Sequence, residues 1–315
     1  MKKLIFILFV SLNLMVVSAE EREEMVAFGD MDSWLSRQID ESGIIGGATK
    51  ILYEVGPEME LVGNEAYENK GGSPWASSNV YARVAGVHKT NSSVFPVAHN
   101  GGKAAHLMTR IEQIKVLGLV NISVIAAGSV YLGSMMEPIK GTSNPQALLN
   151  SGVAFTKRPT AVRFDYKVEL SGEPNRLRIT GFSPKKEVEG MDMPTMVMLL
   201  QKRWEDSDGT LHASRIGTII VNYTQNSDWV EDATYEVIYG DATQSADFIP
   251  SMALGYEQRY ALNSKGENVP LLEESWASAD ETPTHVILHF ASSHGGAYIG
   301  SPGTQMWIDN VRFVY

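Results

Sequence analysis

The chain has 315 residues, of which 43% are apolar and 20% are charged, and it contains no cysteine. This length and apolar content suffice for a well-buried core, and they exclude a disulfide-stapled scaffold and a disordered tail protein. The formal net charge of −11 argues against nucleic acid as a partner, because binding to phosphate backbones needs clustered Lys and Arg.

The first 19 residues have the composition of a secretory signal peptide. Two lysines precede an apolar stretch, Leu4–Val17, and small residues follow it up to Ala19. We expect cleavage after Ala19 and export of the mature chain to the periplasm, the cell surface or the medium. The stretch is shorter than a bilayer span and no cysteine follows it for lipidation, so the sequence favours neither kind of membrane anchor.

Beyond this leader, short apolar runs alternate with Gly, Pro, Asn and Ser, a pattern typical of strands joined by turns and loops. Residues 34–41 and 109–117 have a local helical pattern, but both could equally be strands. We expect strands at 49–55, 104–110, 120–126, 161–169, 175–182, 195–204, 215–222, 234–239, 284–290 and 305–314.

The segment 116–136 carries no charge over about the length of a membrane helix. Asn and Ser residues lie among its glycines, and β-branched runs stand on both sides of a glycine break. We therefore interpret it as two short buried strands and expect no transmembrane helix in the mature chain.

Residues 203–214 predict a hairpin, since Asp206, Asp208 and Gly209 in its middle tolerate positive φ. The same residues imitate the start of a calcium loop. The distal glutamate of that motif is absent, so a simple turn is the better interpretation.

The expected strand at 284–290 has two different faces. Its even-numbered residues from Val286 to Phe290 are apolar, whereas the odd-numbered positions include His285 and His289. The two histidines would stand roughly 13 Å apart along a strand, too far for one zinc ion to bridge. The sheet is therefore expected to have one face in the core and one partly polar face.

Many strands without intervening helices predict an all-β fold, a two-sheet β-sandwich of jelly-roll type with few short helices. No repeat, low-complexity tract or linker divides the mature chain. We expect residues 20–315 to form a single domain.

Three blocks of sequence resemble the bacterial putative carbohydrate metabolism domain family. The first combines AAGSVYLG (126–133) with GVAFTKRPTAVRFDYKV (152–168), the second is DMPTMVMLLQKRWED (192–206), and the third is SSHGGAYIGSPGTQMWIDNVRFVY (292–315). The resemblance covers most of the mature chain, and the three blocks in this order are more specific than any one alone.

This resemblance implies a β jelly roll like that of carbohydrate-binding modules. Some members of the family carry an immunoglobulin-like domain before the jelly roll, and the mature chain is too short on its N-terminal side to hold one. The family has no established catalytic residues that could be carried over to this sequence.

Candidate catalytic groups are not distinctive. Glycoside hydrolysis needs two facing carboxylates roughly 5 to 10 Å apart. An acidic chain always supplies such pairs, and a solvated surface explains them better. Ser292 and Ser293 precede His294 only as sequence neighbours, so a serine nucleophile has no positive support. The carboxylates considered are Glu231, Asp232, Asp241, Glu257 and Glu273.

Aromatic side chains are the strongest candidates for sugar binding, because pyranose rings present apolar faces that stack on them. Three tryptophans lie in polar, loop-like sequence, and we take them as candidate ligand-binding residues, with packing of a loop as the alternative: Trp75, Trp229 and Trp276. The other three lie in apolar strands and are expected in the core: Trp34, Trp204 and Trp307.

No cofactor is required by any motif, but a structural calcium ion could join the chain ends. Jelly-roll binding modules commonly hold such an ion between an early acidic residue and an aspartate on the last strand. Asp30 or Asp32 could meet Asp309 in this way, and the alternative is that Asp309 bonds a loop backbone.

Three functions remain open at this point. The first is non-catalytic glycan recognition by a secreted protein of the bacterial cell envelope. The second is a glycoside hydrolase or other carbohydrate-active enzyme on the same fold, since a fold does not determine function. The third is a structural or adhesive envelope protein without a small ligand.

Overall fold

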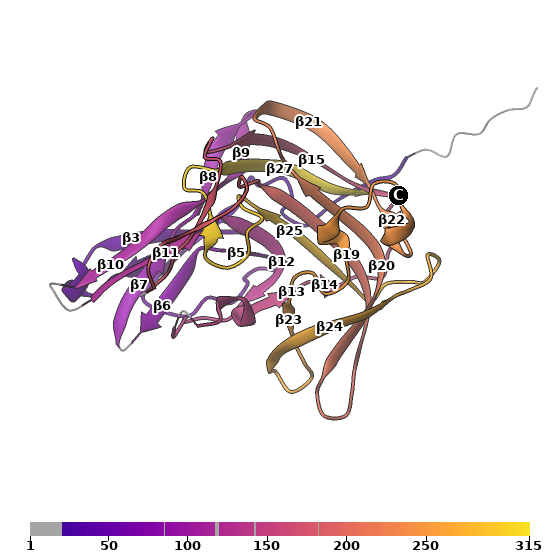
Figure 1. Ribbon diagram of the computed structural model, residues 1–315. Helices are drawn as coiled ribbons and strands as arrows, with labels where there is room; N and C mark the ends of the chain where they lie inside the picture. The colour runs from indigo at the N-terminus through magenta and orange to yellow at the C-terminus, as the bar shows by residue number, and fades with distance from the viewer. Residues whose placement is uncertain (1–20, 85, 117–119, 142, 182) are drawn as a thin grey trace, which may run out of the picture.

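The computed structural model describes residues 21–84, 86–116, 120–141, 143–181 and 183–315. The expected signal peptide, 1–19, lies outside these residues. The described chain is all-β, with four short 3-10 helices: Gly43–Ile45 (η1), Pro145–Leu148 (η2), Ala242–Gln244 (η3) and Pro250–Met252 (η4). Figure 1 shows a β-sandwich with smaller sheets at one side. The prediction of an all-β sandwich with few short helices is confirmed.

The first sheet of the sandwich contains the last strand of the chain. Its order is β21 (Ser227–Glu236), β15 (Ala161–Glu169), β27 (Gln305–Val314), β9 (Gly102–Met108) and β8 (Val94–His99), and β1 (Glu23–Met25) pairs with β27. Both ends of the described chain therefore meet in this sheet.

The second sheet is larger. Its order is β13 (Leu149–Ser151), β12 (Ser129–Met135), β25 (His285–Ala291), β19 (Thr195–Glu205), β20 (Leu211–Asn222), β24 (Asn268–Trp276) and β23 (Arg259–Leu262). Short strands pair beside this path: β5 (Trp75–Ser77), β14 (Val153–Ala154) and β22 (Ile238–Tyr239).

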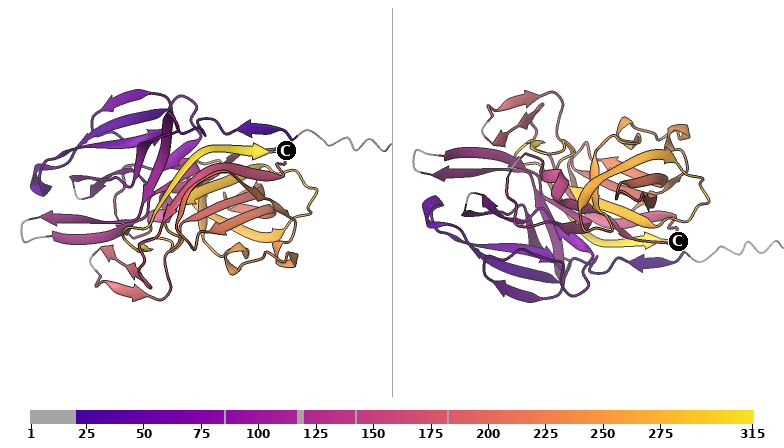
Figure 2. Two further views of the ribbon diagram at one scale, coloured as in Figure 1. Left: turned by 90° about the horizontal axis from the view of Figure 1, so that it is seen from above. Right: turned by 90° about the horizontal axis from the view of Figure 1, so that it is seen from below.

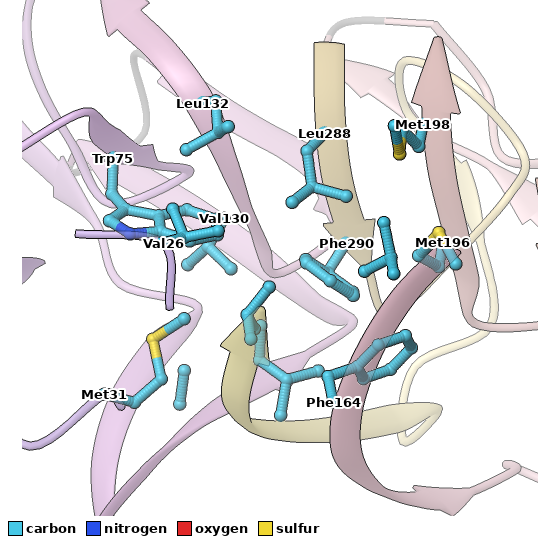
Figure 3. Close-up of a cluster of buried hydrophobic side chains, with 14 of the residues drawn as sticks. Val26, Met31, Trp75, Val130, Leu132, Phe164, Met196, Met198, Leu288 and Phe290 are labelled. Atoms are coloured by element: carbon cyan, nitrogen blue, oxygen red, sulfur yellow. The ribbon is translucent and has the colours of Figure 1, made fainter. Parts of the chain in front are cut away.

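The main core lies between these two sheets. Side chains alternate along each strand, so every second residue points inward. Leu288 and Phe290 of β25 meet Phe164 of β15 and Met196 of β19 there (Figure 3), and Val286 belongs to the same cluster. The predicted apolar face of the 284–290 strand is confirmed.

Smaller sheets lie on the other side of the molecule from β19 and β20 (Figures 1 and 2). One of them contains β2 (Trp34–Asp40), β3 (Thr49–Val55) and β4 (Met59–Val62), and another contains β6 (Val80–Val84) and β7 (Val87–Asn91). A third contains β10 (Arg110–Val116), β11 (Val120–Ala126) and β17 (Thr180–Gly181). A fourth contains β16 (Arg176–Arg178), β18 (Lys186–Val188) and β26 (Ile299–Gly300). Ile39, Leu52 and Tyr81 form a small separate core among them.

Several predicted strands match the structure at both ends, namely 49–55, 120–126, 161–169 and 305–314. The expected strand at 104–110 is instead divided at Thr109, whose backbone N–H donates to Thr304 and whose side chain meets Ser292. The strand expected at 234–239 begins earlier, at Ser227, and Trp229 is part of it.

Within the segment 116–136, the strands β11 and β12 stand where two strands were expected. Only β12 lies in the sandwich; β11 belongs to a small separate sheet, and of its residues 122–126 Ile125 alone is buried, so the expectation of a buried strand was wrong there. The three residues 117–119 lie outside the described part of the chain. No helix among the described residues is long and apolar enough to span a bilayer.

The predicted hairpin at 203–214 is confirmed, since β19 and β20 pair from Thr195↔Asn222 to Glu205↔Leu211. Gly209 has a φ of 95° in the turn, and its N–H donates to the carbonyl of Asp206 at 2.9 Å. This conformation strains residues with a Cβ, which explains the glycine.

Candidate ligand-binding cavity

A cavity of about 750 Å³ lies on the outer face of the larger sheet. The strands β12, β25, β19 and β20 form its floor, and the segments 146–151, 249–260 and 293–296 contribute to its walls. This volume is within the range of small-molecule sites in proteins. It is therefore the first place to search for a ligand.

The floor follows from strand alternation. Tyr131, His289, Val197 and Ile220 are successive cross-strand partners on four neighbouring strands, and all four line the cavity. His289 faces outward because Leu288 and Phe290 point into the core. The polar face predicted for this strand thus becomes the floor of the cavity.

His289 is the central polar group of this floor. Its Nε2 atom is buried and has no hydrogen-bond partner within the described chain. Burial lowers the pKa of His289 to about 4. The positive charge of Arg259 also lowers this pKa, whereas the negative charge of Glu257 raises it. The imidazole is therefore neutral, with a nitrogen left to bond a ligand or a water molecule.

Aromatic and charged side chains follow one another on the wall after η4. Tyr256 is 63% exposed and lines the cavity. Glu257 accepts from Arg259 at 2.8 Å and from Gln146 at 3.3 Å. Tyr260, which also lines the cavity, accepts through its hydroxyl from Asn144 at 3.0 Å. This wall combines a ring surface with hydrogen-bonding groups.

A buried ion pair lies beside the cavity, which its arginine lines. Arg215 binds both carboxylate oxygens of Glu273 and donates to the carbonyl of Met252 at 2.6 Å. Gln201 donates to the same carboxylate at 2.6 Å. Burial would raise the pKa of Glu273, but the hydrogen bonds and charge of Arg215 outweigh it and lower that pKa. Glu273 is thus a carboxylate fixed by its partners.

Of the five carboxylates that the sequence offered, the structure brings two together. Glu257 and Glu273 both line a pocket of about 160 Å³. The others are engaged elsewhere: Glu231 with Asn100, Asp232 with Arg312, and Asp241 with the backbone of Thr243.

A hydrolase also needs a carboxylic acid that stays protonated near neutral pH. Burial raises the pKa of Glu54, Glu112 and Asp309, and all three lie outside the lining of the cavity. The two carboxylates beside the cavity are instead paired with arginines.

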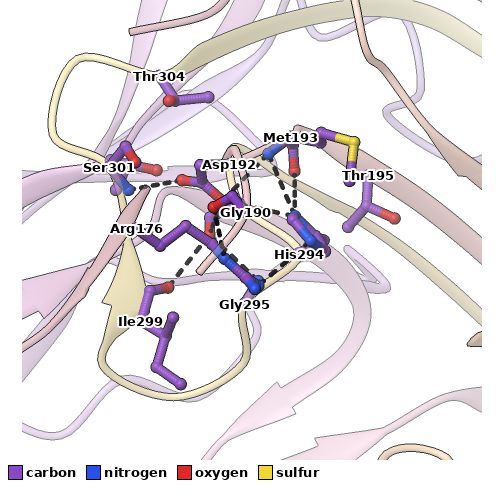
Figure 4. Close-up of polar contacts among 12 residues, drawn as sticks. Arg176, Gly190, Asp192, Met193, Thr195, His294, Gly295, Ile299, Ser301 and Thr304 are labelled. Carbon is purple, nitrogen blue, oxygen red and sulfur yellow. Dashed lines mark hydrogen bonds and ion pairs between the residues drawn. The ribbon is translucent and has the colours of Figure 1, made fainter. Parts of the chain in front are cut away.

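Asp192 fixes another wall of the cavity (Figure 4). Its carboxylate accepts from the hydroxyl of Ser293 and the backbone N–H of Ser301, both at 2.7 Å. His294 lies 3.5 Å from the same carboxylate. Since Ser293 donates to Asp192 and not to His294, these residues do not form a serine nucleophile with its base. Their arrangement anchors the loop 293–301.

The three candidate tryptophans lie in different places. Trp75 is fully buried in the main core, and its indole N–H donates to the carbonyl of Ala27 at 2.8 Å. A ligand cannot stack on a covered ring, so this prediction was wrong. Trp229 belongs to the other sheet, where it stacks on His99 at 3.6 Å. Trp276 is half-buried, with the Arg215 guanidinium 5.3 Å from its ring centre.

The tryptophans expected in the core also differ from one another. Trp34 is buried, as expected. Trp307 is half-buried and stacks on His106 at 4.3 Å. Trp204 is 41% exposed, so its assignment to the core was wrong. The strand β19 extends past its pairing with β25, which ends at Gln201↔His285, and this extension carries Trp204 away from the core.

The aspartates proposed to hold calcium have separate partners. Asp309 accepts from His99 at 2.8 Å, and Asp32 accepts from the backbone of Lys103 at 2.7 Å. Asp30 faces the N–H of Asp32 at 3.4 Å. Among the described residues, no cluster of three acidic or histidine side chains could hold a metal ion. A calcium ion between the chain ends stays a prediction.

The sequence argument missed Tyr256, Tyr260 and Arg215. The signal available was the clustering of two tyrosines with Glu257 and Arg259 in the short stretch 256–260. Nothing local showed that this stretch would cover the outer face of β20 and β25, because that contact depends on distant strand pairing.

Comparison with known proteins bears on this cavity. A crystal structure of a putative glycoside hydrolase from Bacteroides thetaiotaomicron is similar over 86% of this chain and 76% of that chain, with 17% identity and a TM-score of 0.44. No curated protein matches the sequence. Residues 53–314 match the family described as "Putative carbohydrate metabolism domain". The matched residues include every strand of the cavity floor. The chain belongs to this carbohydrate-related family.

Proposed function

We propose that this protein is exported to the cell envelope and binds an oligosaccharide in the cavity of the larger sheet without cleaving it. The observation that carries the proposal is the pairing of an exposed ring, Tyr256, with a buried unpartnered nitrogen, His289 Nε2, in one cavity of about 750 Å³. The description of the family as a carbohydrate metabolism domain supports a sugar over other small ligands.

The chemistry of the cavity suits a sugar in two ways. A pyranose ring has an apolar face that can stack on Tyr256, and its hydroxyls need donors and acceptors around their rim. His289 Nε2 offers one such contact, and the Glu257–Arg259 pair supplies both an acceptor and a donor. A hydroxyl that bonds His289 would also satisfy a buried nitrogen, which costs free energy when unpaired.

Binding by Tyr256 is tested with a soluble-glycan array followed by calorimetry on the glycans retained. The Tyr256→Ala variant is expected to lose about 1 kcal/mol, a roughly fivefold weaker affinity, because it removes the stacking surface. Leu262→Ala is the matched control, since Leu262 is also exposed but does not line the cavity. Equal affinities for wild type and Tyr256→Ala would contradict the proposal.

Glycoside hydrolysis is the second candidate, favoured by the shared position of Glu257 and Glu273 in the smaller pocket. Release of reducing sugar from any bound glycan would support it, provided that Glu257→Gln abolishes the release. Binding without release supports the non-catalytic function.

A further inference from the structure

We propose that Trp204 forms a second sugar-binding surface, for a neutral pyranose, on the hairpin that joins β19 and β20. This hairpin projects beyond the rest of the larger sheet (Figure 1). Trp204 is on the opposite face of β19 from Val197 and Leu199, which line the cavity, and it is the single exposed tryptophan of the six. The surface is therefore separate from the cavity, and its existence does not depend on the cavity's function.

The indole of Trp204 is held in place from one side. His212 is its cross-strand partner, and the two rings stack at 5.3 Å with an interplanar angle of 9°. His212 is itself fixed, since Nδ1 faces Glu274 at 2.8 Å and Nε2 faces Asp206 at 3.1 Å. A ring fixed in this way loses little conformational entropy when a ligand stacks on it.

Beside Trp204, no described strand pairs with the other edge of β19, and the segment before β25 reaches only to Arg203, whose N–H donates to the hydroxyl of Thr284 at 2.9 Å. β25 pairs with β19 only as far as Gln201↔His285, three residues before Trp204. Lys202 lies two residues away on the same face of β19, and its ammonium pairs with Glu281 at 2.6 Å. The open side of the ring is thus bordered by polar groups that can bond sugar hydroxyls.

The charge and the size of the surface around Trp204 favour a neutral sugar over anionic lipid, nucleic acid or a protein partner. Four acidic side chains, Glu205, Asp206, Asp208 and Glu274, lie around the hairpin with the two lysines Lys202 and Lys265, and this excess of negative charge disfavours anionic lipid and nucleic acid. A stable protein partner would cover about 800 Å² per side with several apolar anchors. Leu272, the cross-strand neighbour of His212, is the only other exposed large apolar side chain in that row. One flat ring with polar surroundings fits a single sugar ring.

Fluorine NMR of the mature chain labelled with 5-fluorotryptophan tests this surface directly. Trp204→Phe assigns the Trp204 resonance, and the buried Trp75 is an internal control that should not move. The probes are neutral hexasaccharides of β-linked glucose, mannose and xylose. We expect at least one of them to shift the Trp204 resonance in the wild type and in Tyr256→Ala alike.

Affinity measurements complete the test. In the Tyr256→Ala background, Trp204→Ala should weaken binding of the active hexasaccharide about tenfold, whereas Leu272→Ala, a change of a neighbouring exposed apolar residue, should not. A Trp204 resonance that none of the three probes moves, or that moves only when Tyr256 is present, would overturn this inference. Loss of affinity in Tyr256→Ala without any response of Trp204 would leave the cavity proposal standing, so the two can fail separately.

Discussion

At the scale of single residues, a buried ionic cluster joins β2 and β3 to Glu137. Arg37 donates to Glu54 at 3.0 Å and to Glu137 at 2.5 Å, and all three side chains are buried. Ser77 donates to Glu54 at 2.8 Å, and the N–H of Tyr81 donates to Glu137 at 2.9 Å. Two carboxylates share one guanidinium, so the cluster is closest to neutral when one carboxylate holds a proton.

Glu54 is a carboxyl of this cluster whose pKa is raised. Burial raises its pKa to about 7 against the opposing charge of Arg37, and the charge of Glu137 adds to the rise. Because the folded-state pKa lies above the ordinary value of 4.5, the folded state keeps a proton that the unfolded chain has lost between these two pH values. The cluster therefore favours folding most at low pH and loses that contribution as the pH rises through about 7.

The prediction for Glu54 concerns the free energy of unfolding in urea at pH 5 and pH 8. In the wild type, ionisation of this carboxyl should lower the free energy of unfolding by up to about 3 kcal/mol between pH 5 and pH 8. Glu54→Gln should abolish that decrease, because an amide does not titrate. Glu58→Gln is the control, since the side chain of Glu58 is 76% exposed. If both variants keep the wild-type pH dependence, Glu54 does not titrate as proposed.

At the scale of elements, the loop 293–301 is held to the segment before β19 by the Asp192 carboxylate and by contacts of His294 with the backbone of Met193. Asp192 precedes β19 and accepts from Ser293, from Ser301 and, at 3.1 Å, from the N–H of Met193. The side chain of Asp192 is fully buried. Since His294 and Gly296 line the cavity, this carboxylate also positions part of the cavity wall.

Asp192→Asn is expected to lower the free energy of unfolding by about 1 to 3 kcal/mol, because an amide cannot accept all of these bonds and leaves a buried donor unpaired. Hydrogen exchange at the backbone amide of Ser301 should become faster. Asp228→Asn, at an exposed position, is the matched control. Unchanged exchange at Ser301 would show that the loop is anchored by other contacts.

The local sequence pattern predicted the strands better than it predicted how those strands pack against one another. The alternation from Val286 to Phe290 correctly assigned one face of β25 to the core. The local polarity around Trp75 gave the wrong result, because this residue belongs to a short strand that pairs with β12 inside the sandwich. For Trp204 the error is the reverse: the residue was expected in the core and is exposed, because the apolar strand continues beyond its pairing with β25.

At the scale of the whole molecule, the cavity is made by pairing between distant parts of the chain. Tyr131, His289 and Ile220 become neighbours only through the order β12, β25, β19 and β20. Chain spacing carries no information on that order, so the sequence predicted a polar sheet face but not the residues that close over it. The wall at 249–260 completes a site that faces away from the main core.

The most direct test of the cavity proposal is a crystal structure of residues 20–315 with an oligosaccharide retained on the array. The predicted result is a sugar ring stacked on Tyr256, with a hydroxyl within about 3.2 Å of His289 Nε2. A sugar bound at another surface, with the cavity of the larger sheet left without sugar at saturating ligand, would contradict it.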